Sequence, residues 1–379
     1  MNKKSIEILK IMTIFGTRPE IIRLSCVFAK LDEFTNHIMV HTGQSYDYEM
    51  NQVFFDDLKV RKPDYFLEVK SDTLGEQIAK IIQKTEEVLK KENPDAVLIL
   101  GDTNSALSAI MAKRMKIPIF HMEAGNRSFD ENVPEEINRR IVDHISDINL
   151  PYSENARLYL MQEGIHPGTI FVTGSPFAEI LSFYKKDIDK SQILKKLKLE
   201  KGKYIVASIH REENIDTEES LNSILETMNR VAEKYKMQII VTTHPRTAKK
   251  LEENSFSVHK LVNFHKPFGY FDYVNLQKNA FCVLSDSGSI LEESSILEFP
   301  AVQIRASSER PEAYDAGVSI LSGLNSDVVL QAMNIITCEK KEGIKFDLPD
   351  AYKDTNVSSK VLRHIVGLTK IIQKKRRGF

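Results

Sequence analysis

Charged and polar residues follow almost every short apolar run in this 379-residue sequence. The runs of the first half are followed by GTRPE at 16–20, GDTN at 101–104 and HMEAG at 121–125. Those of the second half are followed by HREE at 210–213 and SDSGS at 285–289. Carboxylates and histidines transfer protons, whereas arginines and helix N-termini bind anions. The pattern therefore predicts proton-transfer chemistry beside a bound anion.

The residue types indicate that the bound anion is a diphosphate. Ser287, Gly288 and Ser289 open an expected helix, whose N–H groups and positive dipole end favour phosphate. Arginines can add bidentate contacts, and the candidates are Arg18, Arg23 and Arg310. There is no P-loop motif and no GxGxxG after the first strand, which argues against an NTPase and a dinucleotide cofactor. HExxH and CxxC are also absent, so we expect neither a cofactor nor a protein-held metal.

Each of these residues also has a purely structural interpretation. Asp102 and Asp286 could be helix N-caps, and Glu135 with Arg139 could be a surface ion pair. His244, at another expected strand end, could be a hydrogen-bonded structural residue. What favours a site is that so many strands end in charged residues, in a chain that carries almost no net charge.

The composition limits the classes of partner that the protein is expected to bind. Lys and Arg number 52 against 53 Asp and Glu, a formal net charge of −1, which argues against a nucleic-acid or anionic-membrane partner. The three cysteines, Cys26, Cys282 and Cys338, show no metal or disulfide spacing. The apolar run at 11–15 lacks a cleavage pattern after it, and no stretch is long enough to span a membrane. We expect a cytoplasmic protein.

Apolar β-branched runs alternate with segments of helical spacing along the chain. Such continuous runs are typical of strands buried on both faces of a parallel sheet. We expect strands at 11–16, 37–43, 96–102, 117–125, 148–153 and 170–174, and then at 204–210, 237–244, 280–286 and 300–305. A charged, helix-prone stretch near 176–200 separates the two sets and is either a linker or a solvated helix face. The chain is thus predicted to be α/β, with two doubly wound domains whose strand ends face a shared crevice.

The motifs, taken together, resemble those of the non-hydrolysing UDP-N-acetylglucosamine 2-epimerases. They occur in the family's order over nearly the whole chain: GTRPEIIRL, HTGQSYDYEMNQVFF, GDTNSA, FHMEAGNRSF, VPEEINRRIVDHISD, VTGSP, SIHREEN, LSDSGSILEE and SERPEA. The resemblance implies a GT-B fold of two Rossmann-like domains, with the active site in the cleft between them. It also implies domains at 1–176 and 177–356, the second binding UDP, and a final helix, 357–379, that packs back on the first.

Within that family the motif sequences most resemble those of the UDP-N-acetyl-L-fucosamine synthases of capsule and O-antigen biosynthesis. These isomerases invert C2 of UDP-2-acetamido-2,6-dideoxy-L-talose. Three departures from the ordinary epimerase pattern support this branch: Arg23 stands where Lys is usual, Ser289 replaces the second glycine of SGG, and the loop between Glu123 and Pro134 is shorter.

The resemblance implies elimination of UDP to a 2-acetamidoglycal, followed by re-addition, and assigns roles to residues of this sequence. The catalytic candidates are Asp102, Glu123, Glu135, His210 and Arg139. Those for holding the UDP-sugar are Arg18, Arg23, Tyr273, Ser287, Gly288, Ser289, Glu293 and Arg310. Tyr273 would pack near the uracil and Glu293 would accept from the ribose hydroxyls. A homodimer is expected by the same resemblance.

Other functions stay open at this point. An ordinary epimerase that forms UDP-N-acetylmannosamine, a hydrolysing epimerase and a GT-B glycosyltransferase would all use a similar nucleotide-sugar cleft. A non-catalytic nucleotide-sugar sensor is the alternative from a different class. Pure binding, however, has no use for several desolvated carboxylates beside a diphosphate.

Overall fold

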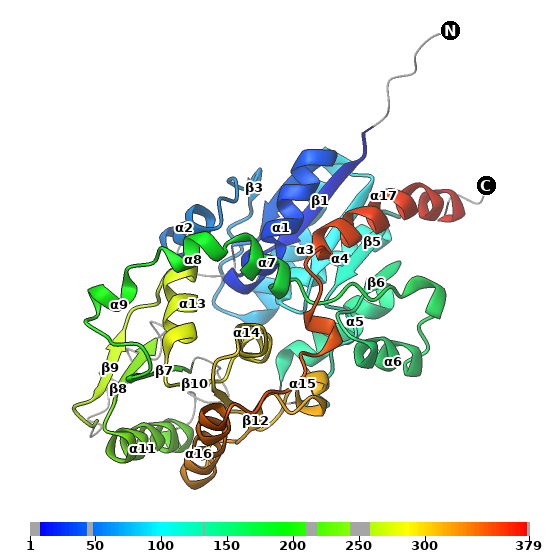
Figure 1. The fold of residues 1–379 in the computed structure, drawn as a ribbon. Helices are drawn as coiled ribbons and strands as arrows, with labels where there is room; N and C mark the ends of the chain where they lie inside the picture. Colours follow the sequence, from blue (N-terminus) through cyan, green and yellow to red (C-terminus); the bar gives the residue numbers. More distant parts are fainter. Residues whose placement is uncertain (1–7, 44–47, 132, 210–217, 243–257, 377–379) are drawn as a thin grey trace. The chain divides into compact units, whose positions relative to one another are not determined.

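The computed structural model describes residues 8–43, 48–131, 133–209, 218–242 and 258–376. The chain forms two compact units, which are described separately (Figure 1). Unit 1 comprises Met1–Ser182 and Lys353–Phe379, and unit 2 comprises Phe183–Tyr352. Each contains one six-stranded sheet in which all the pairings are parallel.

The sheet of unit 1 has the order β3-β2-β1-β4-β5-β6. Its strands are β1 Lys10–Phe15, β2 Asn36–His41, β3 Tyr65–Phe66, β4 Ala96–Leu100, β5 Ile119–Met122 and β6 Ile148–Leu150. Its helices are α1 Arg18–Phe34, α2 Tyr48–Asp57, α3 Leu74–Glu92, η1 Asn104–Ser108, α4 Ala109–Arg114, α5 Pro134–Ile145, α6 Glu154–Gln162, η2 Pro167–Thr169 and α17 Val357–Arg376. The order changes direction between β1 and β4, and open α/β sheets bind ligands at the carboxyl ends of strands around such a point.

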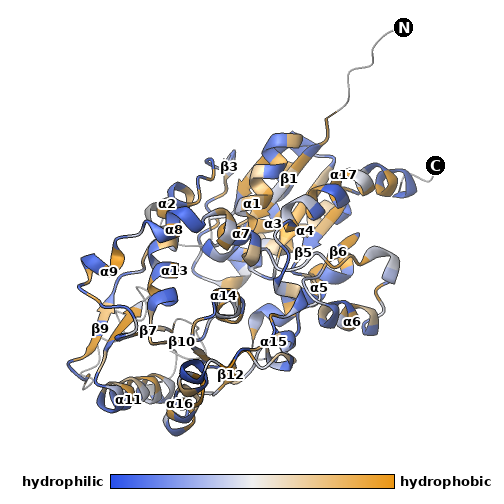
Figure 2. Cartoon of the chain, viewed as in Figure 1, coloured by the Kyte–Doolittle hydropathy of each residue, from blue (hydrophilic) through white to orange (hydrophobic). Residues whose placement is uncertain are grey.

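The local sequence explains these elements. The central strands β1 and β4 are almost entirely apolar and buried, and Figure 2 shows the hydrophobic sheet strands against mixed helix surfaces. Helix α1 begins at Arg18 with Pro19 in its first turn, a favourable position because proline lacks the N–H that a first turn leaves unpaired. Helix α5 likewise begins at Pro134.

The last helix of the chain belongs to unit 1. Helix α17 lies alongside α1, although more than 300 residues separate them in sequence (Figure 1). Glu179 accepts from the Ser358 N–H over 2.8 Å at the start of α17, and Lys370 Nζ lies 2.9 Å from Asp95 Oδ1 near its end. Arg376 pairs with Asp147. Polar contacts thus fix the helix to unit 1 at both ends.

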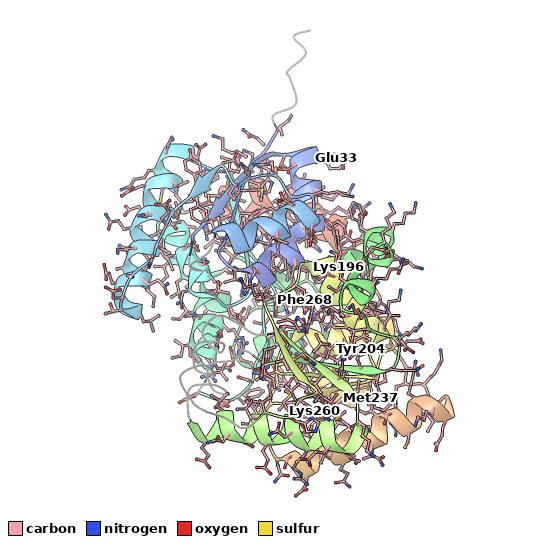
Figure 3. All side chains as sticks on the ribbon, turned by 90° about the vertical axis from the view of Figure 1, so that its left-hand side faces the viewer. Glu33, Lys196, Tyr204, Met237, Lys260 and Phe268 are labelled. Atoms are coloured by element: carbon pink, nitrogen blue, oxygen red, sulfur yellow. The ribbon has the colours of Figure 1, made fainter. Side chains whose placement is uncertain are left out.

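Unit 2 repeats the arrangement, with the order β12-β11-β10-β7-β8-β9. Its strands are β7 Tyr204–Ser208, β8 Gln238–Thr242, β9 Val262–His265, β10 Cys282–Ser285, β11 Ala301–Gln303 and β12 Ile320–Leu321. Its helices include α8 Lys185–Asp189, α9 Ile193–Lys196, α11 Glu218–Tyr235, α13 Tyr270–Asn279, α14 Ser289–Leu297, α15 Pro311–Asp315, α16 Ser326–Glu342 and η3 Asp350–Tyr352. Tyr204, at the start of β7, is packed among the side chains of this unit (Figure 3).

The two parallel sheets confirm the predicted α/β fold, with two differences in detail. The expected strand at 170–174 is wrong, since only Ile170 makes an isolated bridge, to Asn149. The short strands β3, β9 and β12 were not predicted, because two to four residues carry too little periodicity. Of the two interpretations of the stretch 176–200, the helical one is confirmed, since it forms the short helices α7 Phe177–Phe183, α8 and α9.

Candidate functional site

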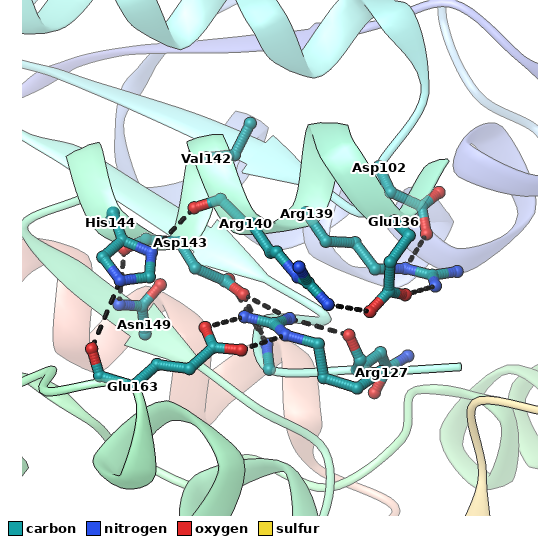
Figure 4. A network of polar contacts seen from close by, with 12 residues as sticks. Asp102, Arg127, Glu136, Arg139, Arg140, Val142, Asp143, His144, Asn149 and Glu163 are labelled. Atoms are coloured by element: carbon teal, nitrogen blue, oxygen red, sulfur yellow. Dashed lines mark hydrogen bonds and ion pairs between the residues drawn. The ribbon is translucent and has the colours of Figure 1, made fainter. Parts of the chain in front are cut away.

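Asp102 lies just past the end of β4, where the chain turns sharply. Gly101, before it, has a positive φ of 68°, which favours glycine. Arg139 of α5 donates from Nε to Asp102 Oδ2 over 2.6 Å (Figure 4). The Asn138 amide donates to the Asp102 carbonyl over 2.9 Å. The structure therefore brings together two of the predicted catalytic residues, Asp102 and Arg139, with a charge-assisted hydrogen bond.

Glu123 follows the neighbouring strand, β5, and is nearly buried. Its φ of 62° is unusual for a residue with a side chain, and such strained backbone clusters at functional sites. Arg23 Nη1 lies 3.4 Å from Glu123 Oε2. Asn126 Nδ2 and the Tyr152 hydroxyl donate to the same carboxylate over 3.3 and 3.4 Å. Arg23, predicted to bind substrate, thus contacts a predicted acid–base group directly.

The first turn of α1 holds a further carboxylate, Glu20, that the sequence did not single out. Glu20 accepts from the Gly16 N–H over 3.1 Å, from the Thr17 hydroxyl over 2.7 Å and from the Thr103 hydroxyl over 3.3 Å. Burial, with the charge of Asp102 adding to it, raises the pKa of Glu20 to about 7. Glu20 therefore joins the loops that follow β1 and β4.

The two adjacent glutamates at the start of α5 have different surroundings. Glu136 is 1% exposed and accepts from the Ser128 N–H, the Ser128 hydroxyl and Arg139 over 2.9–3.1 Å. Burial opposes ionisation of Glu136, but these bonds and the charge of Arg139 hold its pKa below the ordinary value. Glu135 is only partly buried. Glu136 thus anchors the loop that precedes α5, whereas Glu135 keeps solvent access.

A buried ion-pair network supports the edge formed by β4 and β5. Asp143 of α5 lies 2.8 Å from Arg127 Nη1, and Arg127 in turn lies 2.5 Å from Glu163 (Figure 4). His121 of β5 lies 2.9 Å from the same Asp143. Burial would raise the pKa of Asp143, but the hydrogen bond from His121 and the charges of His121 and Arg127 lower it. The carboxylate is therefore ionised inside unit 1.

The remaining predicted residue of unit 1 is Arg18. It lies in the first turn of α1, directly after β1, and its guanidinium carbon is 5.6 Å from the centre of the Phe54 ring. Arg23 makes a similar contact with Phe177, also at 5.6 Å. The two arginines are thus placed by aromatic side chains at the same end of the sheet as Asp102 and Glu123.

In unit 2, the serines predicted to hold phosphate lie where β10 leads into α14. The Ser287 N–H donates to Ser285 Oγ over 3.1 Å, and the Ser289 N–H donates to Ser287 Oγ over 3.3 Å. The Ser287 and Ser289 hydroxyls are 2.9 Å apart. A β-carbon on Gly288 would come within 2.9 Å of Glu309 Oε1, so a side chain here would displace the Glu309 carboxylate. Hydroxyl and N–H donors are therefore gathered at one helix start.

Two buried arginines lie next to this turn. Arg310 Nη2 is 3.3 Å from Glu292 Oε2, and Arg305 Nη1 is 2.9 Å from Glu309 Oε2. Both guanidinium groups are at most 1% exposed, so their charges need these carboxylates. The predicted phosphate ligand Arg310 is thus an internal residue already paired with Glu292.

Glu293 and Tyr273 lie close to each other in the same unit. Gln277 donates from Nε2 to Glu293 Oε2 over 3.1 Å, and both side chains are buried. Burial, with the charge of Glu293 adding to it, raises the pKa of the Tyr273 hydroxyl well above its ordinary value. That hydroxyl also contacts Ser208 and Gln277. A role of Tyr273 beside the uracil stays a prediction.

Some predictions fall outside the described residues, namely those on His210 and His244. Among the residues that are described, no group of three or more His, Cys, Asp or Glu side chains could hold a metal ion. No helix in the described ranges is long and apolar enough to cross a membrane.

Comparison with known proteins decides the family. The family model described as UDP-N-acetylglucosamine 2-epimerase matches residues 29–366. The chain belongs to the UDP-N-acetylglucosamine 2-epimerase family. A solved structure of UDP-N-acetylglucosamine 2-epimerase from Rickettsia bellii is 48% identical, with a TM-score of 0.90, over 97% of this chain and 99% of that one. The protein is thus an isomerase with a GT-B-like fold, as the motifs predict.

Two further relatives bear on the ligand. The Methanocaldococcus jannaschii UDP-GlcNAc 2-epimerase, solved in complex with UDP-GlcNAc and UDP, is 35% identical with a TM-score of 0.87, and the match covers 95% of this chain and 100% of that one. A UDP-2,3-diacetamido-2,3-dideoxy-D-glucuronate 2-epimerase from Pseudomonas aeruginosa is 33% identical over 86% of this chain and 91% of its own length. Relatives of this epimerase thus act on different UDP-sugars.

Sequence reasoning missed the residues that hold the catalytic candidates in place. These are Glu20, Asn126, His121, Glu136 and Asp143. All five lie within the quoted motifs GTRPEIIRL, FHMEAGNRSF and VPEEINRRIVDHISD, so the motifs contained the signal. The sequence alone could not show which side chains turn toward Asp102 and Glu123.

Proposed function

We propose that this epimerase inverts C2 of UDP-2-acetamido-2,6-dideoxy-L-talose, giving UDP-N-acetyl-L-fucosamine for capsule or O-antigen synthesis in the cytoplasm. The observation that carries an epimerisation of this kind is the placement of Asp102 and Glu123. They follow adjacent strands, and each is held by an arginine, Arg139 and Arg23 respectively. Inversion needs one proton-transfer group on each face of C2, and two carboxylates at neighbouring strand ends fit that need.

The reaction is an elimination followed by an addition. C2 of the sugar has no carbonyl beside it, so a base cannot remove its proton unless the C1–oxygen bond breaks as well. The base takes the C2 proton, the C–H electron pair forms the C1–C2 double bond, and UDP leaves with the electrons of the C1–oxygen bond. Proton delivery to the opposite face of C2 and return of the UDP oxygen to C1 then give the epimer.

The chain's residues divide between these tasks. In unit 1, Asp102, Glu123 and Glu135 are the proposed acid–base groups, and Arg18 and Arg23 add positive charge. In unit 2, the proposed UDP ligands are Ser287, Gly288, Ser289, Glu293 and Arg310, and His210 assists the leaving group. The hydroxyls and N–H groups at the start of α14 support the phosphate role.

The choice of a 6-deoxy sugar rests on the departures from the ordinary epimerase pattern. Arg23 contacts Glu123, and Ser289 adds its hydroxyl beside Ser287, so both changes lie at residues assigned to the substrate. UDP-N-acetylglucosamine is the second candidate, because the Rickettsia bellii and Methanocaldococcus jannaschii relatives bear that name.

A parallel assay in D2O tests both parts of this proposal. The purified enzyme is incubated with each of the two sugar nucleotides, and products are followed by NMR. We expect deuterium at C2 of UDP-N-acetyl-L-fucosamine and little turnover of UDP-N-acetylglucosamine. The reverse preference would overturn the substrate, epimerisation without deuterium at C2 would overturn the mechanism, and release of free sugar would indicate hydrolysis. Glu123→Gln should abolish turnover while UDP still binds.

A further inference from the structure

His121 is a buried imidazole that the epimerisation mechanism does not use. It lies on β5, two residues before Glu123, and its side chain is 1% exposed. Its Nδ1 is 2.9 Å from Asp143 Oδ1, and its Nε2 is 2.8 Å from the Gly101 carbonyl oxygen. A carboxylate and a carbonyl can only accept hydrogen bonds, so both ring nitrogens have to donate. The geometry therefore favours the imidazolium form.

The surrounding charges are consistent with that ion. Asp143 receives two cations, His121 and Arg127, and Arg127 pairs on its other side with Glu163. The four groups, two acids and two bases, sum to zero charge. Each buried charge thus has a partner, which is the condition under which such charges persist in a protein interior.

The His121–Asp143 pair contacts the backbone beside both catalytic candidates. Gly101, whose carbonyl it binds, immediately precedes Asp102, and a β-carbon on Gly101 would lie 3.9 Å from Glu123 Oε2. Asp143 also accepts from the Gly125 N–H over 3.2 Å, just beyond Glu123. The His121–Asp143 pair therefore ties the turn that carries Asp102 to the strained turn that carries Glu123.

We propose that His121, as an imidazolium held by Asp143, is a positioning residue for the epimerisation: it fixes the spacing between Asp102 and Glu123 and places a positive charge behind them. This rests on the proposed roles of those two carboxylates. Proton transfer falls steeply when reacting groups are misplaced by about 1 Å, so loosening this contact affects turnover more than nucleotide binding.

The chain offers a matched control on the opposite edge of the same sheet. His37 is also buried, its Nδ1 lies 2.7 Å from Asp32 Oδ1, and its Nε2 lies 3.0 Å from the Thr13 hydroxyl. It stands near the start of β2, whereas His121 stands near the end of β5. Removing either histidine breaks the pair between a buried imidazole and an aspartate in unit 1, although Asp32 is exposed whereas Asp143 is buried. Only the His121 pair adjoins Asp102 and Glu123.

The test compares His121→Gln with His37→Gln, on the UDP-sugar that the wild-type enzyme turns over. For His121→Gln we expect kcat to fall by about tenfold to a hundredfold, with KM changed less than about threefold. The acid limb of the kcat–pH profile should move up by about half a pH unit, because a nearby positive charge that favours ionised carboxylates is lost. The double variant His121→Gln/Asp143→Asn, which restores charge balance, should move the limb back without restoring kcat.

The charged groups that could also move that limb are Asp143 on α5, Arg127 on the loop before it, Glu163 after α6 and Glu123 on the strand end itself. His37→Gln should lower thermal stability and leave the profile in place. If His121→Gln keeps the wild-type profile and kcat per folded molecule, the positioning role is refuted.

A measurement on the unmodified protein keeps the proposal testable if the variant does not fold. Long-range ¹H–¹⁵N NMR of the wild-type enzyme near neutral pH should show both His121 nitrogens protonated, and a neutral tautomer would overturn the imidazolium. Failure of the wild-type enzyme to exchange deuterium into C2 of either sugar would instead refute the proposed function, and the NMR result is independent of it.

Discussion

Arg139 Nη1 lies 2.9 Å from Glu136 Oε2, and the same guanidinium reaches Asp102 through its Nε. The three side chains come from α5 and from the turn after β4. Because the charge of Arg139 is shared between two carboxylates, the position of Asp102 depends on a residue, Glu136, that has no proposed contact with the substrate. Glu136 thus positions Asp102 through Arg139, whereas its neighbour Glu135 is a proposed acid–base group.

We expect Glu136→Gln to lose mainly stability and Glu135→Gln to lose mainly catalytic activity. Glu136→Gln removes the charge that compensates Arg139 inside the protein, so it should lower the free energy of unfolding by about 3 kcal/mol. Glu135→Gln should leave stability within about 0.5 kcal/mol, since Glu135 is only partly buried, and lower kcat by more than about a hundredfold if it transfers a proton. Urea unfolding followed by circular dichroism and the epimerase assay measure the two quantities. Equal loss of stability in both variants would contradict the division.

The pair also shows what sequence alone can and cannot predict. The apolar runs at 96–102 and 117–125 predict buried parallel strands, β4 and β5, and place Asp102 and Glu123 at one edge of a sheet. Whether Glu135 or Glu136 turns inward depends on how α5 is rotated against the loop at Ser128. Two adjacent glutamates in a sequence give no information about that rotation.

Local patterns fail for a similar reason at the sheet edges. Strands β3 and β12 have two residues each, and they form only because a neighbouring strand offers free hydrogen-bonding groups. The run at 170–174 has the composition of a strand but makes a single bridge, at Ile170. In each case the partner, and not the segment itself, decides the structure.

Glu20 should make unfolding depend on pH. Its pKa rises from 4.5 to about 7 on folding because burial disfavours the charged carboxylate. Between these values the folded state holds a proton that the unfolded state has lost, so stability is greatest below about pH 4.5 and falls as pH rises toward about 7. At about 1.4 kcal/mol for each pH unit, the fall is about 3 kcal/mol.

The neutral isostere Glu20→Gln isolates this contribution. Its stability should fall less than that of the wild type over the same pH range, by about 3 kcal/mol, because an amide does not titrate. Urea unfolding of both proteins at a series of pH values from 5 to 8 gives the difference directly. Parallel curves for the two proteins would show that Glu20 is ionised in the folded state throughout.

Gln277 should tune nucleotide affinity through Glu293. Its amide donates to Glu293 Oε2 over 3.1 Å, so Gln277→Leu removes this donor from that buried carboxylate. If Glu293 accepts from the ribose, UDP should bind about tenfold more weakly, which corresponds to one lost hydrogen bond to a charged group, while kcat at saturation stays near the wild-type value. The matched control is Asn275→Leu. Asn275 is also a buried amide on helix α13, but it donates to the Ile188 carbonyl and not to Glu293. It should lower stability and leave UDP affinity unchanged. Calorimetric titration with UDP distinguishes the two, and equal weakening in both variants would assign the effect to α13 as a whole instead of to Glu293.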